Sequence, residues 1–316
     1  MNRAKLLKGE ADVTIGSFTR VIESTFNGRP KPNILTGNWW VRRGEAYRLL
    51  GDYQRAEKDF EDALRVLHMY EYWRWELLAI SALGEIHLLR RDYGSAKQKF
   101  ESALQIAILD RNPYGIAACQ YRLGLVEHLS GHLEEAKALY NKVFKCNFKP
   151  ILYATYIKAA ILSRQLSGEY PDKAAGHLET SREQVSKGIQ LCRDILKDSG
   201  DYFDVKINLA LALLLEGQDA DAAAFYENLW NFCLQHRLKG AEDAIMMDIE
   251  LLKRVPVASF PNMRPLGPFY EVYTGDRVSP LARKSGWNAK TQALTGAALA
   301  VVAVAGAIAL QYLRTR

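Results

Sequence analysis

The sequence predicts an all-α fold, a right-handed solenoid of helix–turn–helix units followed by a C-terminal transmembrane helix. Two observations predict it. One pattern is written three times between residues 40 and 143, and an uncharged apolar run occupies residues 291–313. The marker glycines of the three copies, Gly44, Gly84 and Gly124, lie 40 residues apart. A fixed period in this range is typical of stacked units, because no single unit can bury its apolar face alone.

Each copy has the residue spacing of two packed helices. After Tyr53 come Ala56, Phe60 and Ala63, at intervals that place all four on one face of an α-helix. The same positions of the later copies hold Tyr93, Ala96, Phe100 and Ala103, then Leu133, Ala136, Tyr140 and Val143. We expect the marker glycine of each copy to lie where two helices approach so closely that a side chain would separate them.

These residues resemble the tetratricopeptide repeat (TPR) family, whose marks are a Trp, a Leu-Gly pair, a Tyr, and then Ala, Phe and Ala in the second helix. The first copy matches at Trp40, Gly44, Tyr47, Ala56, Phe60 and Ala63, the second at Leu83, Gly84, Ala96, Phe100 and Ala103, and the third at Leu123, Gly124 and Ala136. The usual unit has about 34 residues. The longer period here predicts lengthened first helices.

The rest of the chain divides by composition. Residues 1–37 are predicted to form a capping helix, near 12–25, and a loop that ends the array. The solenoid spans 38–253, with clear units at 37–150 and degenerate units at 151–253. Within the degenerate part we expect helices near 151–166, 181–197, 202–215, 222–234 and 241–253. A Pro-rich basic linker at 254–290, the apolar run at 291–313 and a basic tail at 314–316 follow.

The charge distribution and the cysteines restrict the ligands and the compartment that we expect for this protein. The formal net charge is +6, but residues 254–290 carry six basic and two acidic side chains, and Arg314 and Arg316 follow. The body at 1–253 is therefore neutral, which argues against a nucleic-acid surface. The four cysteines are far apart and form no Cys-x-x-Cys pair, so we expect buried thiols in a reducing compartment.

No catalytic motif is present. The sequence holds no phosphate-binding glycine loop, nucleophile elbow or paired metal-ligand motif, so we predict a protein that is no enzyme and takes no cofactor or metal. His128 and His132 have a spacing that can chelate a metal on a helix, but Gly131 is expected to end that helix between them.

The family resemblance implies a concave groove lined by the first helix of each unit. The groove candidates are Asn38, Val41, Glu45, Leu78, Ser81, Glu85, Tyr121, Leu125 and His128, with Ala118 among them and Arg122 beside them. Glu45 and Glu85 occupy the same position in successive units. We therefore expect both to face one cleft that attracts a basic amphipathic helix. The alternative is that they are solvated residues of a helix face.

A second candidate surface lies between the first two units. Tyr70, Tyr72, Trp73 and Trp75 place four aromatic side chains within six positions. They form either a binding ledge or packing beneath a long helix. The sequence leaves open whether the groove or this ledge is the binding surface.

The apolar run at 291–313 is predicted to be a tail anchor. Its 23 uncharged residues, bracketed by Lys290 and Arg314, would span about 34 Å as a helix, enough for a hydrocarbon core of about 30 Å. Insertion would then follow synthesis and leave residues 1–290 in the cytosol. The anchor residues include Leu294, Val301, Val304, Ile308 and Leu310.

These features predict a membrane-tethered adaptor or receptor that binds protein segments on the cytosolic face. Its tail resembles those of mitochondrial outer-membrane TPR receptors and biogenesis proteins. We therefore expect protein import or biogenesis at that membrane, with another organelle membrane as the alternative location. Expected partners are peptides, helices and other membrane subunits, in homo- or hetero-oligomers, and no nucleic acid.

Two other functions stay open. The first is a chaperone-docking cochaperone resembling tail-anchored immunophilins, which clamp a C-terminal carboxylate with Lys and Asn. The equivalent positions here hold Val41, Glu45, Ala82 and Ala118, and only Arg122 is basic, which disfavours this alternative. The second is an organelle fission or scaffold adaptor.

Overall fold

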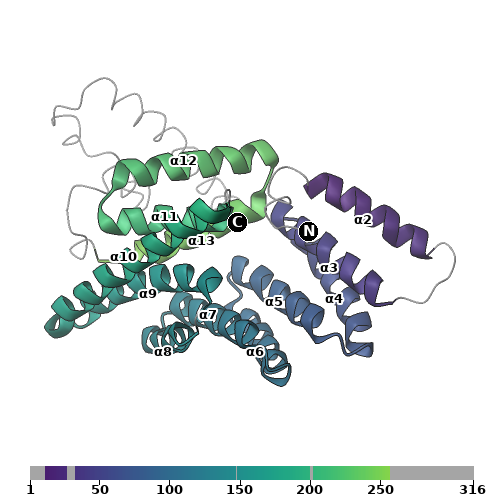
Figure 1. Cartoon of the computed structure of the whole chain (residues 1–316), viewed down its shortest axis with the longest axis horizontal. Helices are drawn as coiled ribbons and strands as arrows, with labels where there is room; N and C mark the ends of the chain where they lie inside the picture. The colour runs from purple at the N-terminus through teal and green to yellow at the C-terminus, as the bar shows by residue number, and fades with distance from the viewer. Residues whose placement is uncertain (1–10, 27–32, 147, 200–201, 257–316) are drawn as a thin grey trace.

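The computed structural model describes residues 11–26, 33–146, 148–199 and 202–256, and within them every regular element is helical. Figure 1 shows these helices as one curved array. In chain order they are α2 (Ala11–Phe26), α3 (Ile34–Leu50), α4 (Tyr53–Met69), α5 (Trp73–Leu89), α6 (Tyr93–Leu109), α7 (Pro113–Ser130), α8 (Leu133–Phe144), α9 (Lys149–Glu169), the 3-10 turn η2 (Pro171–Lys173), α10 (Ala174–Ser199), α11 (Phe203–Glu216), α12 (Asp219–His236) and α13 (Lys239–Lys253).

The three clear units are the antiparallel pairs α3/α4, α5/α6 and α7/α8, and their glycines are where the helices meet. A methyl group on Gly44 would lie 2.9 Å from the ring of Phe60. The equivalent distances are 2.6 Å from Gly84 to Phe100 and 2.7 Å from Gly124 to Tyr140. All three rings are buried. The expected close approach is confirmed, and a side chain at these positions would push the paired helices apart.

The two helices of a unit are joined by turns of one kind. Gly51 and Gly131 end α3 and α7 with φ values of 78° and 89°, in the left-handed region that favours glycine. Arg91 takes the same conformation after α5, with φ 63°. The side chains of Asp52 and Asp92 then accept hydrogen bonds from the backbone N–H groups of Arg55 and Ser95, which caps the second helix of the first two units. In the third unit His132 stands at this position and makes no such bond.

Helices α9 to α12 continue the antiparallel pattern, and α9 and α10 are its longest members, with 21 and 26 residues. The helix expected near 181–197 is wrong in its start, because α10 already begins at Ala174 and runs for 26 residues. Pro171 occupies the first position of η2, where a missing N–H is tolerated, so the chain re-enters a helix at once. A methyl group on Gly176 would meet nothing within 4 Å, and the helix continues through this residue.

Helix α2 packs on α3 at one end of the array. Ile22 lies in one buried cluster with Trp40 and Val41, and Arg43 donates to the hydroxyl of Thr19 at 3.1 Å. Val41, a groove candidate, is therefore core. This corrects the expectation for that residue, since α2 covers the face on which it lies.

Helix α13 returns from the far end of the chain to the first unit. Tyr53, at the start of α4, donates to Asp243 of α13 at 2.6 Å, and Arg91 pairs with Glu250 at 3.0 Å. Arg254 donates to the backbone oxygen of Leu129 at 2.7 Å. In Figure 1, α13 lies beside α11 and reaches α3. We call the turns that α13 crosses, at 50–53, 90–93 and 130–133, the turn edge.

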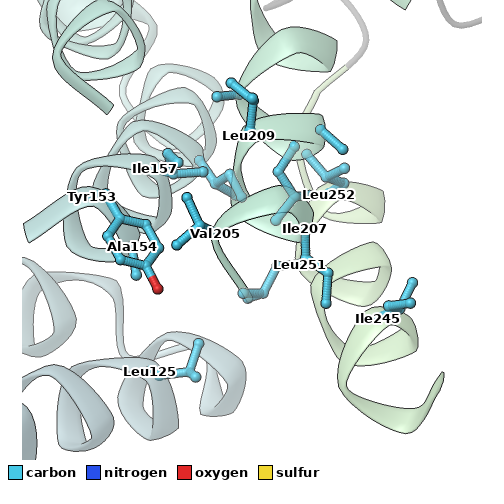
Figure 2. Close-up of a cluster of buried hydrophobic side chains, with 14 of the residues drawn as sticks. Leu125, Tyr153, Ala154, Ile157, Val205, Ile207, Leu209, Ile245, Leu251 and Leu252 are labelled. Carbon is cyan, nitrogen blue, oxygen red and sulfur yellow. The ribbon is translucent and has the colours of Figure 1, made fainter. Parts of the chain in front are cut away.

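The core joins helices from both halves of the array. Figure 2 shows Leu125, Tyr153 and Ile157 of α7 and α9 facing Val205 of α11 and Leu251 of α13. Within this cluster, Cys192 and Cys233 are buried free thiols, and Cys119 is buried in a smaller cluster nearby. The fold is thus closed by α11 and α13 across the face where the sequence predicted an open groove.

The predicted anchor lies outside the described residues, together with its candidates Leu294, Val301, Val304, Ile308 and Leu310, the linker from residue 257 onward and the tail. In the part of the chain that the structure describes, no helix is both long enough and apolar enough to cross a membrane.

Candidate functional site

An alternating row of charged side chains crosses the first helices of the three clear units. Arg48 of α3 binds Glu45 with two donors, at 2.9 and 2.5 Å, and lies 3.4 Å from Glu85 of α5. Arg122 of α7 binds the other side of Glu85 at 2.9 and 2.6 Å. We call these four residues the ion ladder. It ties three successive units together by charge-assisted contacts.

The ion ladder changes the expected chemistry of the groove. Glu45 and Glu85 do face one place, as their equivalent positions predict, but each is matched by an arginine of the same chain. Burial by itself would lower the pKa of Arg48, and the two carboxylates outweigh it and raise that pKa above its usual value. The ladder therefore carries no net charge. The expectation of an acidic cleft for a basic helix is wrong, because Arg48 and Arg122 neutralise it.

The groove candidates of the third unit lie beneath other helices. Leu125 is buried in the cluster with α11 and α13, and His128 is fully buried. The His128 ring lies 3.0 Å from the Gln165 side-chain oxygen, and burial lowers its pKa to about 3, so it is neutral. Burial also raises the pKa of Tyr121 above its usual range. Leu125 and His128 belong to the interior, and the correction follows from the return of α11 and α13, whereas Tyr121 is only partly buried and packs against this core.

The groove remains open over the first halves of α3 and α5. Leu78 of α5 is 48% exposed and Leu35 of α3 is exposed as well, whereas Ser81 is buried. Arg42 donates to Asn38 at 2.8 Å and lies 5.1 Å from the ring centre of Trp75. Among the described residues no carboxylate lies within ion-pair distance of Arg42. This open part presents apolar surface and one cation that lacks a carboxylate partner.

The opposite edge of the array carries a second surface. We call the loops that join successive units, with their flanking turns at 68–76, 108–116 and 142–150, the loop edge. Seven of the exposed large apolar side chains of the described residues lie here, namely Met69, Tyr70, Tyr72, Trp73, Ile108, Leu109 and Tyr114. Tyr114 also stacks with Phe148 of the next loop at 4.4 Å between ring centres.

The predicted aromatic ledge is therefore split. Tyr70, Tyr72 and Trp73 are exposed, in agreement with a binding ledge, whereas Trp75 is partly buried beneath Arg42. The sequence did not show that the ledge continues into the next loop, because Leu109 reads as the end of an apolar helix run and Tyr114 is a lone aromatic residue there. The signal that could have found it is the period of 40 residues, which places Leu109 at the position of Met69.

Comparison with known proteins identifies the repeats. Residues 35–108 match the family model described as tetratricopeptide repeat. The chain contains tetratricopeptide repeats. The matched stretch covers α3 to α6, the two copies in which the sequence pattern is most complete. It includes Glu45, Arg48 and Glu85 of the ion ladder and the first loop of the loop edge.

Two curated relatives are much longer chains. Tetratricopeptide repeat protein 37 of Xenopus laevis is 26% identical over 192 residues, which is 60% of this chain and 11% of the relative. Superkiller complex protein 3 of Homo sapiens is 26% identical over 169 residues, 52% of this chain and 10% of that protein. The chain thus spans about a tenth of the length of these relatives.

Among solved structures, a Rap protein in complex with competence and sporulation factor is similar in fold. It has a TM-score of 0.44 and 19% sequence identity, and the alignment covers 78% of this chain and 72% of that one.

His128 and His132, whose spacing could chelate a metal on a helix, have other partners in the structure. His128 faces Gln165 and Tyr140, and His132 pairs with Glu127 at 2.6 Å. Because Gly131 ends α7 between them, the two rings do not converge. Within the described ranges, no group of three or more metal-ligating side chains occurs. What the TPR arrangement offers is surface for binding proteins, in the open groove and at the loop edge.

Proposed function

We propose that this protein is a membrane-tethered TPR adaptor that binds a segment of another protein in the open groove of its first two units. TPR repeats mediate protein–protein interaction, and residues 35–108 carry them. The observation that supports this surface is the exposure of Leu35 and Leu78 on the two helices that Arg42 and Trp75 join, on a face where the third unit is already covered by the chain itself.

The open groove favours a particular kind of ligand. Apolar side chains at Leu35 and Leu78 would receive the apolar face of a helix, as in other helix-in-groove complexes. The ion ladder is internally neutral and offers no net attraction to either charge. Arg42, which lacks a carboxylate partner among the described residues, would bind an acidic side chain of the ligand. The proposed ligand is therefore an acidic amphipathic helix, and not the basic one that Glu45 and Glu85 alone suggested.

A photo-crosslinking amino acid at Leu78 of the full-length protein tests this binding site. The matched control carries it at Val13, an exposed apolar residue of α2. We expect adducts from Leu78 only, and we expect Arg42→Gln to abolish them. Sequencing of the captured segment should give an acidic amphipathic helix. Equal labelling from both positions, adducts that survive Arg42→Gln, or a basic captured segment would disprove the proposal.

We further propose that the tail at 291–313 anchors the protein in the mitochondrial outer membrane with residues 1–290 in the cytosol, and that its ligands belong to protein import or biogenesis there. The support is the sequence: an uncharged run of spanning length with basic flanks. Carbonate extraction of organelles tests the tether, with and without residues 291–316. Release of the full-length protein, or retention of the truncated one, would contradict it.

A cochaperone function finds little support. A carboxylate clamp needs cationic side chains that point into the groove with no other partner. Arg122, the basic residue at the family's clamp positions, is held by Glu85 at 2.6 Å. A ligand carboxylate would have to break that pair before it could bind.

A further inference from the structure

We propose that the loop edge is a contact surface for a lipid membrane with anionic headgroups. The inference stands on the described residues of the three loops and is independent of whether the open groove binds a helix. Contiguous exposed apolar surface marks a site of association with a protein or a membrane. Three features of this edge favour the membrane.

The first feature is the kind of side chain. Tyr70, Tyr72, Trp73 and Tyr114 are aromatic residues with a polar tip, and this class is enriched where a protein meets the headgroup region of a bilayer. Met69 and Leu109 add longer apolar side chains that are 68% and 72% exposed. Such side chains would reach past the headgroups into the acyl boundary.

The second feature is the charge of this edge. In the first two loops Arg74 and Arg111 are balanced by Glu71 and Asp110, whereas the third loop exposes Lys142, Lys145 and Lys149 and contains no carboxylate. The third loop meets the second through the contact of Tyr114 with Phe148, so the positive charge lies at one end of the exposed apolar surface. A basic surface of this kind is attracted to anionic headgroups, and long basic side chains can extend toward phosphates while their stems cover apolar atoms.

The third feature is the geometry. Glu71 and Arg111, 40 residues apart, share the left-handed conformation, with φ values of 51° and 49°. The two loops therefore turn in the same way and project Met69 and Leu109 from equivalent positions. The exposed apolar side chains of the two loops therefore recur at the same place in successive helix pairs. A bilayer receives such side chains without a shaped pocket, whereas a protein partner would need a complementary surface for them.

Fluorescence quenching of Trp73 tests the proposal. Full-length protein is bound to, or reconstituted in, vesicles of phosphatidylcholine and phosphatidylserine with brominated or ordinary acyl chains. The signal of Trp73 is the difference between the wild-type protein and Trp73→Phe. We expect Trp73 to lose most of its emission in the brominated vesicles. The loss should diminish in pure phosphatidylcholine, and it should also diminish in Lys145→Gln/Lys149→Gln, because the attraction is electrostatic.

A matched pair of variants separates the loop edge from other exposed surface of the array. Leu109→Ser/Tyr114→Ser removes side chains of the loop edge and should reduce the quenching of Trp73. Tyr170→Ser removes an exposed tyrosine of another part of the array, after α9, and should leave it unchanged. Trp73 that stays unquenched in vesicles that hold the protein would overturn the proposal, as would equal quenching in all variants. The loop edge would then be a protein-binding surface.

Discussion

The turn edge and the loop edge are built from the same repeats, yet they present opposite surfaces. At the turn edge, α13 lies across the ends of α3, α5 and α7 and binds them through Asp243, Glu250 and Arg254. At the loop edge, seven large apolar side chains are exposed. A repeat array has two such edges, and this chain covers one with its own C-terminal helix.

The difference between the two edges shows which surfaces remain available to ligands. The turn edge is rich in backbone carbonyls and charged groups, and α13 satisfies them with polar contacts. The apolar surface of α7 and α9 is buried against α11 and α13 as well. Ligands therefore meet either the open groove around Leu78 or the loop edge. The predictions below test this contrast, from the largest expected effect to the smallest.

The contact between α13 and α9 should be the most sensitive. Lys158 is almost fully buried and pairs with Asp248 of α13 at 2.6 Å. Asp248→Ala leaves this ammonium buried without its carboxylate, which costs about 3–5 kcal/mol of unfolding free energy. Urea denaturation measures it. As a control, Glu183→Ala breaks the exposed Lys187 pair and should cost less than about 1 kcal/mol. Equal losses would mean that α13 is not held there.

Two glycine substitutions should have opposite effects. A methyl group on Gly240 would overlap the backbone oxygen of Arg48, where α13 lies against α3. Gly240→Ala should therefore cost about 1–3 kcal/mol. Gly176→Ala adds a methyl group where nothing lies within 4 Å and should raise stability by about 0.5–1 kcal/mol. Thermal unfolding of both variants measures the two changes in stability. A neutral Gly240→Ala would contradict the close contact of α13 with α3.

Low pH should reduce the unfolding free energy, because His128 is buried as a neutral ring on the side of the array that α11 and α13 cover. Burial, with Lys158 and Arg254 nearby, lowers its pKa to about 3, against the hydrogen bond to Gln165, which raises it. Because the unfolded state keeps the ordinary pKa of about 6.5, it takes up the proton first. Stability is present above that pH and is lost as pH falls toward 3. The loss is about 1.4 kcal/mol per pH unit. Urea unfolding at several pH values checks it, and a His128→Gln variant with an unchanged slope would contradict it.

Substitution at the loop edge should hardly change stability. Leu109→Ser alters a side chain that is 72% exposed and should shift the unfolding free energy by no more than about 0.5 kcal/mol. Leu251→Ala, on α13, removes a fully buried side chain and should cost about 2–5 kcal/mol. Urea denaturation of both variants compares the two losses of unfolding free energy, one at the exposed loop edge and one in the covered core. A large loss for Leu109→Ser would mean that this edge is packed within the molecule.

The repeats could be predicted from sequence because their cause is local. Gly44, Gly84 and Gly124 mark helix contacts within one unit, and the pattern of Ala and Phe on the following helix states which face is buried. The helices α11 and α12 follow the expected bounds within three residues, and Gly217 ends α11 with a left-handed turn. Local spacing was sufficient wherever the partners lie within one or two units.

The covered groove could not be predicted in this way. Nothing in the spacing of α13 states that Asp243 meets Tyr53, because the two are 190 residues apart and belong to no common repeat. The ion ladder was missed for a related reason. Glu45 and Glu85 recur at one position of the repeat, so the period reveals them. Arg48 does not recur, because Leu88 occupies its position in the second unit. The charge of the site thus depends on residues that do not follow the repeat.

The return of α13 also has a consequence for biosynthesis. Tyr53 leaves the ribosome 190 residues before Asp243, so at about 5–20 residues per second the first unit waits about 10–40 s for its partner helix. During that interval the side chain of Leu49, which later shares a buried cluster with Leu251, lacks its partners from the last helix. The first two units therefore complete their packing only when the last described helix arrives.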